Sequence, residues 1–427
     1  MVVGTIIGAS IFVQPSLVSG AVPSVSGMLL VWAVAGVLTL IGALVTAELA
    51  SAFPGTGGVY VFLRESYSPS VAFLWCWAMF WSMHTGIIAA IATVCARYVG
   101  FFVPLGDTGV RVVAIGAILV LSGVNYVGVR YGTAVQTTFT IIKVAAVVLI
   151  AIVGFVAPHP VPTLADTSVP PSVPSLRALV AATVAGLFAF GGWHMVTYTG
   201  DETVNARRTI PRALLIGTLA VTASYIAVNA AYLAVLSPAA VASSTRVAAD
   251  FANLVMGDGG AAAMSALVVL STLGAMTGII LTGPRVYFAA ARDGLLFRWI
   301  GAIHPRYGTP HHAIALQAVW ASILVATGTY RALFTRVVYT EWIFFGLMTA
   351  GLFVLRRRAS YAPAYRAWGY PVLPLVFIVS TAVIVFNQLA SDPVESATGL
   401  LIVLAGLPIY YLRTARLNSR TATDADH

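Results

Sequence analysis

Residues 1–16 read MVVGTIIGASIFVQPS, an apolar segment that is interrupted near its middle by three small residues, Gly-Ala-Ser at 8–10. A similar interruption occurs in LFAFGGWHMVTYTGDE, residues 187–202, where two glycines stand together at 191–192. A glycine in a helix interior costs about 1 kcal/mol relative to alanine. The two interruptions therefore predict two helices that are unwound near their centres; the alternative is that the small residues serve only for close helix packing.

The composition as a whole indicates a membrane protein with many spans. Of the 427 residues, 59% are hydrophobic and 9% charged, and the mean hydropathy is +0.93. Each crossing of a bilayer takes about 20 mostly apolar residues, so we expect an all-α polytopic protein embedded in the lipid bilayer. The twelve expected transmembrane helices lie near residues 1–21, 27–52, 70–103, 110–128, 132–157, 177–200, 210–236, 260–289, 311–329, 333–355, 371–390 and 396–413.

Basic residues in the connecting segments set the expected orientation. If both termini are cytoplasmic, the inner segments hold fifteen arginines and the outer segments five. This asymmetry predicts a multi-pass protein of the cell membrane with its N- and C-termini inside. The expected connectors are inner amphipathic segments at 53–68 and 290–310, an outer proline-rich extended loop at 158–176, an outer segment with a short helix at 237–259, and a polar, disordered tail at 414–427.

The sequence disfavours several classes of function. The net charge of +9 comes from arginines in short segments between apolar runs, and no basic stripe indicates binding of nucleic acid. Cys76 and Cys95 lie in one apolar segment and predict two buried small side chains, not a disulfide framework. No HExxH, GxSxG or P-loop motif and no metal-ligand cluster occurs, so we expect neither an enzyme nor a metal or cofactor. No filter-like re-entrant loop is present, which disfavours an ion channel.

The two interrupted helices favour a transporter. They are the first and the sixth of the expected spans, and paired interruptions of this kind are typical of an inverted repeat with a substrate site near the bilayer midplane. Unwound backbone exposes N–H groups that attract a carboxylate and C=O groups that accept hydrogen bonds from an ammonium, and an α-amino acid carries both. The expected contacts are the amides near Ala9, Ser10 and Ile11 for the carboxylate, and the carbonyls of Ile6, Phe188 and Gly191 for the ammonium.

Longer motifs resemble one family along essentially the whole chain. GTIIGASIF at 4–12 is similar to the first-helix motif GxIIGSGIF of amino acid permeases in the amino acid–polyamine–organocation (APC) superfamily, particularly the L-type (LAT) branch. LFAFGGWHMVTYTGDETVNARRTIPRAL at 187–214 resembles the sixth-helix motif of that branch and its following loop. Further similar stretches are AELASAFPGTGGVYVFLRESYSP at 47–69, RVYFAAARDGLLFRWIGAIHPRYGTPHHAI at 285–314, EWIFFGL at 341–347 with LRRR at 355–358, and WGYPVLPLVFI at 368–378.

The resemblance implies the LeuT-type fold, a 5+5 inverted repeat with helices 1 and 6 broken. In this sequence the single transporter domain would consist of a first five-helix repeat at 1–157, a second at 177–358, two peripheral helices at 370–413 and the cytoplasmic tail at 414–427. The halves show no clear sequence identity, so the repeat is inferred from the positions of the breaks and from the resemblance.

The resemblance also implies a substrate site. Phe188 would be an aromatic gate and Trp342 a distal wall, although either could instead be a core aromatic. Two departures bear on the substrate: Ser10 replaces the usual third small residue, Gly, and His194 stands where some relatives carry Asn. His194 would either line the pocket or hydrogen-bond within the bundle. The candidate substrate-binding residues are Ile6, Gly8, Ala9, Ser10, Ile11, Phe188, Gly191, Trp193, His194 and Trp342.

Lys143, in TTFTIIKVAAVVLIAIVG at 137–154, is the only lysine among 23 basic residues. A lysine at the centre of a membrane helix costs roughly 2.5–3.5 kcal/mol and is functional by default, and its central position argues against snorkelling. The resemblance implies that its ammonium replaces a structural sodium of sodium-coupled relatives and bonds unwound carbonyls near Gly4 or Ile7, with Ser271 or Thr272 as further partners. A role in proton coupling is the alternative.

Three more polar residues lie within expected helices. Glu341 and Glu48 either carry a proton or pair with an arginine or a helix end, and His84 is expected to be satisfied within the bundle. The predicted function is secondary active transport of neutral L-amino acids by alternating access, as sodium-independent exchange or proton-coupled uptake, by a monomer or homo-oligomer. The alternative is a polyamine or cationic amino acid permease, for which Glu341 is the candidate pocket carboxylate.

Overall fold

The computed structural model describes residues 1–8, 10–156, 174–328 and 330–425. Within these ranges it leaves undescribed the side chains of residues 129, 130, 133, 258, 330–338 and 416–425. The described residues form helices joined by loops and contain no β-strand. The predictions for Ala9 and for residues 158–173 of the proline-rich loop lie outside the described residues.

The helices follow one another along the whole described chain. The first half contains α1 (Val2–Ile6), α2 (Ser10–Ala21), α3 (Val25–Ala52), α4 (Val59–Ser66), α5 (Pro69–Ala78), the π-helical turn η1 (Met79–Met83), α6 (His84–Val99), α7 (Asp107–Val127) and α8 (Val129–Val156). The second half contains α9 (Leu176–Ala189), the 3-10 helix η3 (Trp193–Glu202), α10 (Ala206–Val235), α11 (Pro238–Ser243), α12 (Val247–Met256), α13 (Asp258–Arg292), η4 (Arg298–Gly301), α14 (His311–Thr327), α15 (Tyr330–Leu355), α16 (Val372–Ser391), α17 (Pro393–Leu404) and α18 (Gly406–Ala425).

Nine helices in the described residues are long and apolar enough to cross a membrane. They correspond to the second to eighth, eleventh and twelfth of the expected spans. The first expected span is divided between α1 and α2, and the ninth and tenth are shorter apolar helices, His311–Thr327 and Tyr339–Leu355 in their described parts. The all-helical class is therefore confirmed, and the count of twelve stays a prediction.

Serine caps explain where several of these helices begin. The side chains of Ser24, Ser68, Ser175 and Ser237 each accept a hydrogen bond from the backbone N–H three residues later. Such a cap satisfies one of the free N–H groups in the first helical turn. Proline at the first helical position, after Ser68 and Ser237, adds a fixed φ where no N–H is needed.

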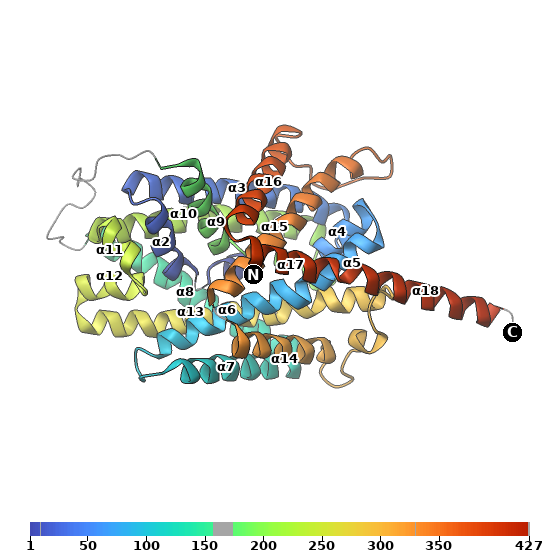
Figure 1. Ribbon diagram of the computed structural model, residues 1–427, viewed down its shortest axis with the longest axis horizontal. Helices are drawn as coiled ribbons and strands as arrows, with labels where there is room; N and C mark the ends of the chain where they lie inside the picture. The colour runs from blue at the N-terminus through green and yellow to red at the C-terminus, as the bar shows by residue number, and fades with distance from the viewer. Residues whose placement is uncertain (9, 157–173, 329, 426–427) are drawn as a thin grey trace.

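The helices form two groups (Figure 1). One group contains α1, α2, α3, α9, η3 and α10, in which α10 packs on α3 and α2 packs on α9. The other contains α6, α7, α13 and α14, which pack on one another and lie together in the lower part of Figure 1. The groups touch directly where α13 meets α1 and η3, and they are further joined by α8, which touches both α10 and α13, and by α15, which touches both α3 and α6.

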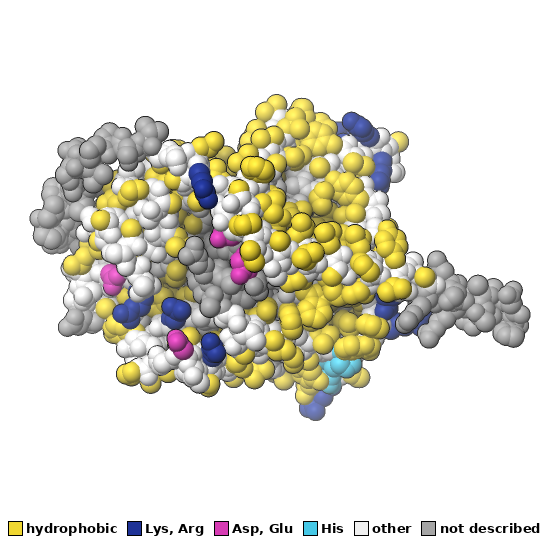
Figure 2. Space-filling view, viewed as in Figure 1, with side chains coloured by type: hydrophobic (Ala, Val, Ile, Leu, Met, Phe, Trp, Pro, Cys, Tyr) yellow, Lys and Arg dark blue, Asp and Glu magenta, His cyan; other side chains and the backbone are white. Residues whose placement is uncertain are grey.

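The outer surface is apolar over wide areas, as expected for helices that face lipid. Figure 2 shows hydrophobic side chains over much of the face in view, with charged side chains in separate small groups. Phe386 and Leu401 of the last helices are more than half exposed. Contiguous apolar surface of this kind marks contact with a membrane or a partner, and it agrees with the composition.

Two connecting segments differ from expectation in detail. Residues 237–259 contain two short helices, α11 and α12, where one was expected. The prediction of a disordered tail was wrong for most of its length, because α18 continues to Ala425. Extending a helix that already exists fixes one residue for each hydrogen bond gained, so a polar tail can continue a membrane helix at little cost.

Candidate functional site

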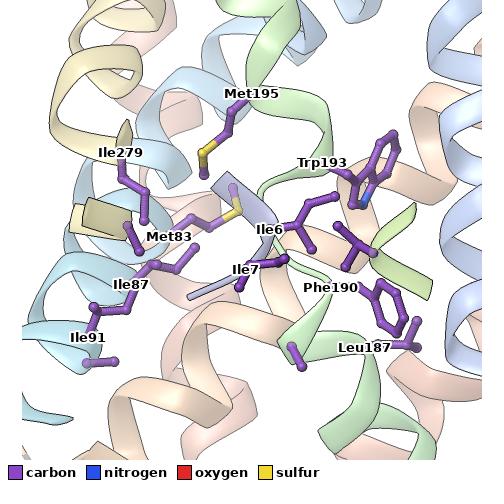
Figure 3. Packing of buried hydrophobic residues seen from close by; sticks show 14 of the residues in the cluster. Ile6, Ile7, Met83, Ile87, Ile91, Leu187, Phe190, Trp193, Met195 and Ile279 are labelled. Atoms are coloured by element: carbon purple, nitrogen blue, oxygen red, sulfur yellow. The ribbon is translucent and has the colours of Figure 1, made fainter. Parts of the chain in front are cut away.

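The first predicted break is confirmed in the backbone. Helix α1 ends at Ile6 and α2 begins at Ser10. Ile7, directly after α1, is extended, with φ −68° and ψ 96°. Figure 3 shows this extended chain at Ile6 and Ile7 between the side chain of Trp193 and those of Ile87 and Ile91. The interruption therefore places backbone, not only side chains, in the middle of the helix bundle.

The second predicted break is also confirmed, and it meets the first. Helix α9 ends at Ala189 and η3 begins at Trp193. Gly192 between them has φ 91°, in the left-handed region that favours glycine. A Cβ atom at Gly192 would lie 2.9 Å from the carbonyl oxygen of Thr5, closer than real Cβ contacts allow. Glycine at this position thus permits the second unwound segment to touch the last turn of α1.

A tyrosine from a third helix joins the ends of the two broken helices. Tyr225 of α10 is fully buried, and its Oη lies 3.1 Å from Ile6 O and 3.0 Å from Ala189 O. These are the last residues of α1 and α9, whose final carbonyls have no partner within their own helices. The phenol has one proton, which it shares between the orphan carbonyls of both breaks, and this fixes the distance between them.

Lys143 of α8 contacts the same region from another side. Its Nζ lies 2.5 Å from Gly4 O and 2.6 Å from Ile7 O, and the residue is 0% exposed. These are the two carbonyls near which the contact was expected. The further partners Ser271 and Thr272 are not joined to Lys143: Ser271 Oγ has no hydrogen-bond partner in the described part of the chain, and Thr272 Oγ1 donates to Val269 O.

A cavity lies where the two breaks meet. Its volume is small, about 30 Å³. Seven predicted substrate-binding residues line it: Ile6, Gly8, Ser10, Phe188, Gly191, Trp193 and Trp342. The predicted residues Ile11 and His194 are buried beside the cavity and do not line it, and Ala9 lies outside the described residues. Two interrupted helices, their free backbone groups and a shared cavity form the candidate site.

Comparison with known proteins agrees with this architecture. The sequence profile described as amino acid permease matches residues 1–411. The chain belongs to the amino acid permease family.

Individual relatives cover nearly the whole permease. The mouse large neutral amino acids transporter small subunit 2 is 32% identical over 427 residues, 96% of this chain and 79% of that protein. The serine/threonine exchanger SteT of Bacillus subtilis is 32% identical over 96% of this chain and 94% of its own length. The human b(0,+)-type amino acid transporter 1 is 33% identical over 96% of this chain and 85% of its own length. This family is part of the APC superfamily. Because the family model and the relatives are permeases and exchangers, this membrane protein is a permease and not an enzyme.

Sequence reasoning missed part of the permease cavity. The residues that line it without having been proposed are Thr5, Ile87, Ile91, Leu187, Gly192, Met195, Ile279 and Phe345, and Glu341, which also lines it, had been proposed only as the pocket carboxylate of the alternative function. Two pairs, Ile87 with Ile91 and Glu341 with Phe345, have the i, i+4 spacing of one helix face, a signal that periodicity could have given. Tyr225, behind the cavity, acts through the backbone carbonyls of the distant residues Ile6 and Ala189, which no local pattern reveals.

Glu341 and His194 form a buried polar pair at the edge of the cavity. Glu341 Oε1 lies 3.6 Å from His194 Nε2, too far for a hydrogen bond, and the residues are 5% and 0% exposed. Within the described residues, Glu341 Oε1 and both ring nitrogens of His194 have no hydrogen-bond partner. Buried polar groups without a partner are rare and call for an explanation.

His84, on α6, is buried but not satisfied as expected. Neither of its ring nitrogens has a hydrogen-bond partner in the described part of the permease. Its ring contacts that of Tyr198, with 5.6 Å between centroids. Its ring also contacts that of Tyr287, with 6.4 Å between centroids, so aromatic contacts pack around His84.

The structural interpretation of Glu48 is confirmed. Arg356 donates two hydrogen bonds to Glu48, at 2.9 Å to Oε1 and 2.5 Å to Oε2, and the hydrogen-bonded carboxylate raises the pKa of Arg356. The backbone N–H of Ala367 donates to Oε2 as well, at 2.7 Å. Glu48 thus ties the end of α3 to the segment that follows α15, away from the cavity.

Proposed function

We propose that this permease carries out secondary active transport of neutral L-amino acids by alternating access. The observation that carries the proposal is the meeting of two helix breaks around one cavity. A zwitterion needs N–H donors for its carboxylate and C=O acceptors for its ammonium within a few ångströms, and two unwound segments supply both kinds of group. The relatives named above as amino acid transporters support the same substrate class.

The proposed carboxylate contacts are the amides near Ser10 at the start of α2, together with the predicted Ala9 and Ile11. The proposed ammonium contacts are the carbonyls of Ile6, Phe188 and Gly191. Ile6 O already accepts from Tyr225, and Phe188 O accepts from Gly191 N, but a carbonyl oxygen has two lone pairs and can accept a second donor. Because the cavity is small, side chains around it must move apart to admit substrate.

The proposed mechanism does not use sodium. Lys143 would act as a fixed cation in place of a bound ion, since its ammonium supplies positive charge to the carbonyls of Gly4 and Ile7. Transport would then be either exchange of one amino acid for another or proton-coupled uptake. We further propose the LeuT-type arrangement of twelve helices, with repeats at 1–157 and 177–358, in the cell membrane with both termini in the cytoplasm.

The test is uptake by purified permease in proteoliposomes. A panel of radiolabelled amino acids is offered with and without internal amino acid, with and without sodium, and at two pH values. Saturable uptake of neutral amino acids without sodium is expected. Dependence on internal amino acid would identify exchange, whereas dependence on the pH gradient would identify proton coupling. Uptake that fails to saturate, or that requires sodium, would contradict the proposal.

A polyamine or cationic amino acid permease is the second candidate. The observation in its favour is that Glu341 lines the cavity, since a carboxylate there could bind a distal ammonium. Putrescine, lysine and arginine therefore belong in the panel. Uptake of any of them above that of every neutral amino acid would favour this candidate.

A further inference from the structure

The walls of the cavity are uneven in their chemistry. Most lining side chains are aliphatic or aromatic, and Glu341 is the one ionisable residue among the described residues that line the cavity. Apart from Glu341 and the aromatic residues, the lining side chains with a polar atom are those of Thr5 and Ser10. Thr5 Oγ1 already donates to Val2 O at 3.0 Å. In this largely apolar cavity, the carboxyl group of Glu341 is the strongest polar group that a substrate side chain could contact.

The oxygen of Glu341 without a hydrogen-bond partner is the one nearest His194, while the residue as a whole lines the cavity. Behind the carboxyl group stands His194, whose ring is packed against those of Trp75, Trp193, Tyr198 and Phe345 at centroid distances of 4.8–6.1 Å. Glu341 Oε1 has no hydrogen-bond partner within the described chain. A buried polar group without a partner is destabilising, so a ligand that supplies the missing hydrogen bond gains affinity.

The charge state of Glu341 and His194 narrows the class of substrate group that can bind to them. A lone buried charge is unfavourable, so Glu341 and His194 together hold one proton and remain neutral, as carboxylic acid with imidazole or as carboxylate with imidazolium. The other titratable groups that face the pair are Tyr198 on η3, beside His194, and His84 on α6, beside Tyr198. None of these supplies a permanent charge. Such a pair suits a neutral group that both donates and accepts, which is the property of a hydroxyl.

We propose that Glu341 is a specificity-determining residue that binds a hydroxyl on the substrate side chain, and that His194 positions it. The permease would then select serine and threonine over apolar amino acids of equal size, a substrate class that rests on the proposed function. The hydroxyl donates to one carboxyl oxygen of Glu341. Valine, which has a methyl group in place of the threonine hydroxyl, leaves Glu341 desolvated and unpaired.

The size of the cavity points in the same direction. Its volume of about 30 Å³ is close to that of one water molecule, so the walls must move apart to admit any substrate, and a small substrate requires the smallest movement. Ser10 stands where the related motif usually has glycine and narrows the site near the substrate α-carbon. A small side chain that reaches only as far as Glu341 fits these limits better than a large one.

The experiment compares substrates that differ in a side-chain hydroxyl: threonine with its isostere valine, and serine with alanine, which lacks the hydroxyl. Uptake of radiolabelled threonine and valine, and of serine and alanine, is measured in proteoliposomes for the wild type and for Glu341→Leu, Glu341→Gln and His194→Phe. Wild-type KM should be roughly 10- to 100-fold lower for threonine than for valine, the range expected for an unpaired buried polar group. Asp392→Asn, a loss of a carboxylate at the start of α17, is the matched control and should behave like the wild type.

The variants separate recognition from folding. In Glu341→Leu the ratio of the KM values for valine and threonine should fall to about one, because the hydroxyl no longer has a partner. Glu341→Gln keeps the shape and one acceptor oxygen, so it should keep part of the preference, and it supplies the test where Glu341→Leu does not fold. His194→Phe should lower the preference for threonine over valine, read as the ratio of the two KM values, because His194 acts through Glu341.

Three results would overturn the inference. They are equal wild-type KM values for threonine and valine, an equal loss of both substrates in Glu341→Leu and Glu341→Gln, and a preference for lysine or putrescine over threonine. Each of them would leave amino acid or amine transport itself intact. The absence of saturable uptake of any compound in the panel would instead contradict the proposed function, so the two failures are distinguishable.

Discussion

The side-chain nitrogen of Lys143 lies 2.6 Å from the carbonyl oxygen of Ile7, the first residue after α1. This contact joins the middle of α8 to the unwound part of the first span. A carbonyl that has left a helix in an apolar interior must find another donor, because no water is present to replace the lost hydrogen bond. Lys143 provides that donor and holds the break open from the side of α8.

Replacing Lys143 by alanine should therefore impair transport severely. The change leaves the carbonyls of Gly4 and Ile7 unsatisfied, at about 1–3 kcal/mol for each buried group. We expect uptake to fall roughly 10-fold or more while membrane insertion is retained, since alanine suits a membrane helix better than lysine does. Lys143→Arg keeps the charge but is larger and planar, so it should restore transport poorly.

Uptake measured with and without sodium tests whether Lys143 takes the place of a bound ion. Uptake by the wild type should be the same with sodium chloride and with choline chloride, because the ammonium is a permanent part of the protein. Uptake by Lys143→Ala at wild-type rates would make the lysine incidental to transport. Strong sodium dependence of the wild type would contradict the proposal that the lysine replaces an ion.

A glycine at the second break should tolerate no side chain. In Gly192→Ala the new Cβ would meet Thr5 O at 2.9 Å in a backbone conformation, φ 91°, that costs an alanine about 1–2 kcal/mol. We expect loss of substrate binding, measured as the loss of substrate-induced thermal stabilisation. Gly20→Ala is the matched control, because a Cβ there meets nothing within 4 Å, and its binding should equal that of the wild type.

Both breaks could be predicted from the sequence because small residues stand in the interior of otherwise apolar helices, a local and costly pattern. The lysine could be predicted because a charge in such a helix is equally exceptional. In contrast, the contacts of Tyr225 with Ile6 O and Ala189 O join residues 219 and 36 positions apart. A tyrosine in an amphipathic or buried helix face has no pattern that sets it apart, so its partners required the fold.

The place of Glu341 illustrates the same limit. The sequence identified it as a carboxylate within an expected helix and left its role open between proton carrier and structural partner. Which helix face points to the cavity depends on how α15 is rotated against α6, and this rotation depends on packing. Because Glu341 lines the cavity, the choice between neutral and cationic substrates cannot be made from the absence of a charged side chain there.

Ser10 should set the size limit of the substrate. Ser10→Gly restores the usual residue of the motif and enlarges the site beside the substrate α-carbon. The KM for leucine and phenylalanine should fall, and that for serine should change little. The measurement is competition of each amino acid against a labelled substrate. An unchanged order of preference across the panel would show that Ser10 does not limit the size of the substrate.

The ion pair of Glu48 with Arg356 should be needed for stability and not for recognition. Glu48 is 0% exposed, and breaking a buried pair by removing one partner costs about 3–5 kcal/mol. Glu48→Gln should lower the melting temperature in detergent, whereas the KM of the folded fraction should stay at the wild-type value. Arg356→Lys should also lower the melting temperature, because an ammonium cannot make the two parallel hydrogen bonds that the guanidinium makes to Glu48. A changed KM in Glu48→Gln would contradict a purely structural role.

Two tyrosines of α10 allow the link between the breaks to be tested with a control in the same helix. Tyr225→Phe removes the hydroxyl that donates to Ile6 O and Ala189 O, and should lower both thermal stability and substrate affinity, by about 1–3 kcal/mol in free energy of unfolding. Tyr232 is equally buried, but its hydroxyl has no hydrogen-bond partner in the described chain. Tyr232→Phe should therefore be neutral or stabilising and leave transport unchanged. Equal effects of the two substitutions would show that the Tyr225 hydroxyl does not hold the broken helices together.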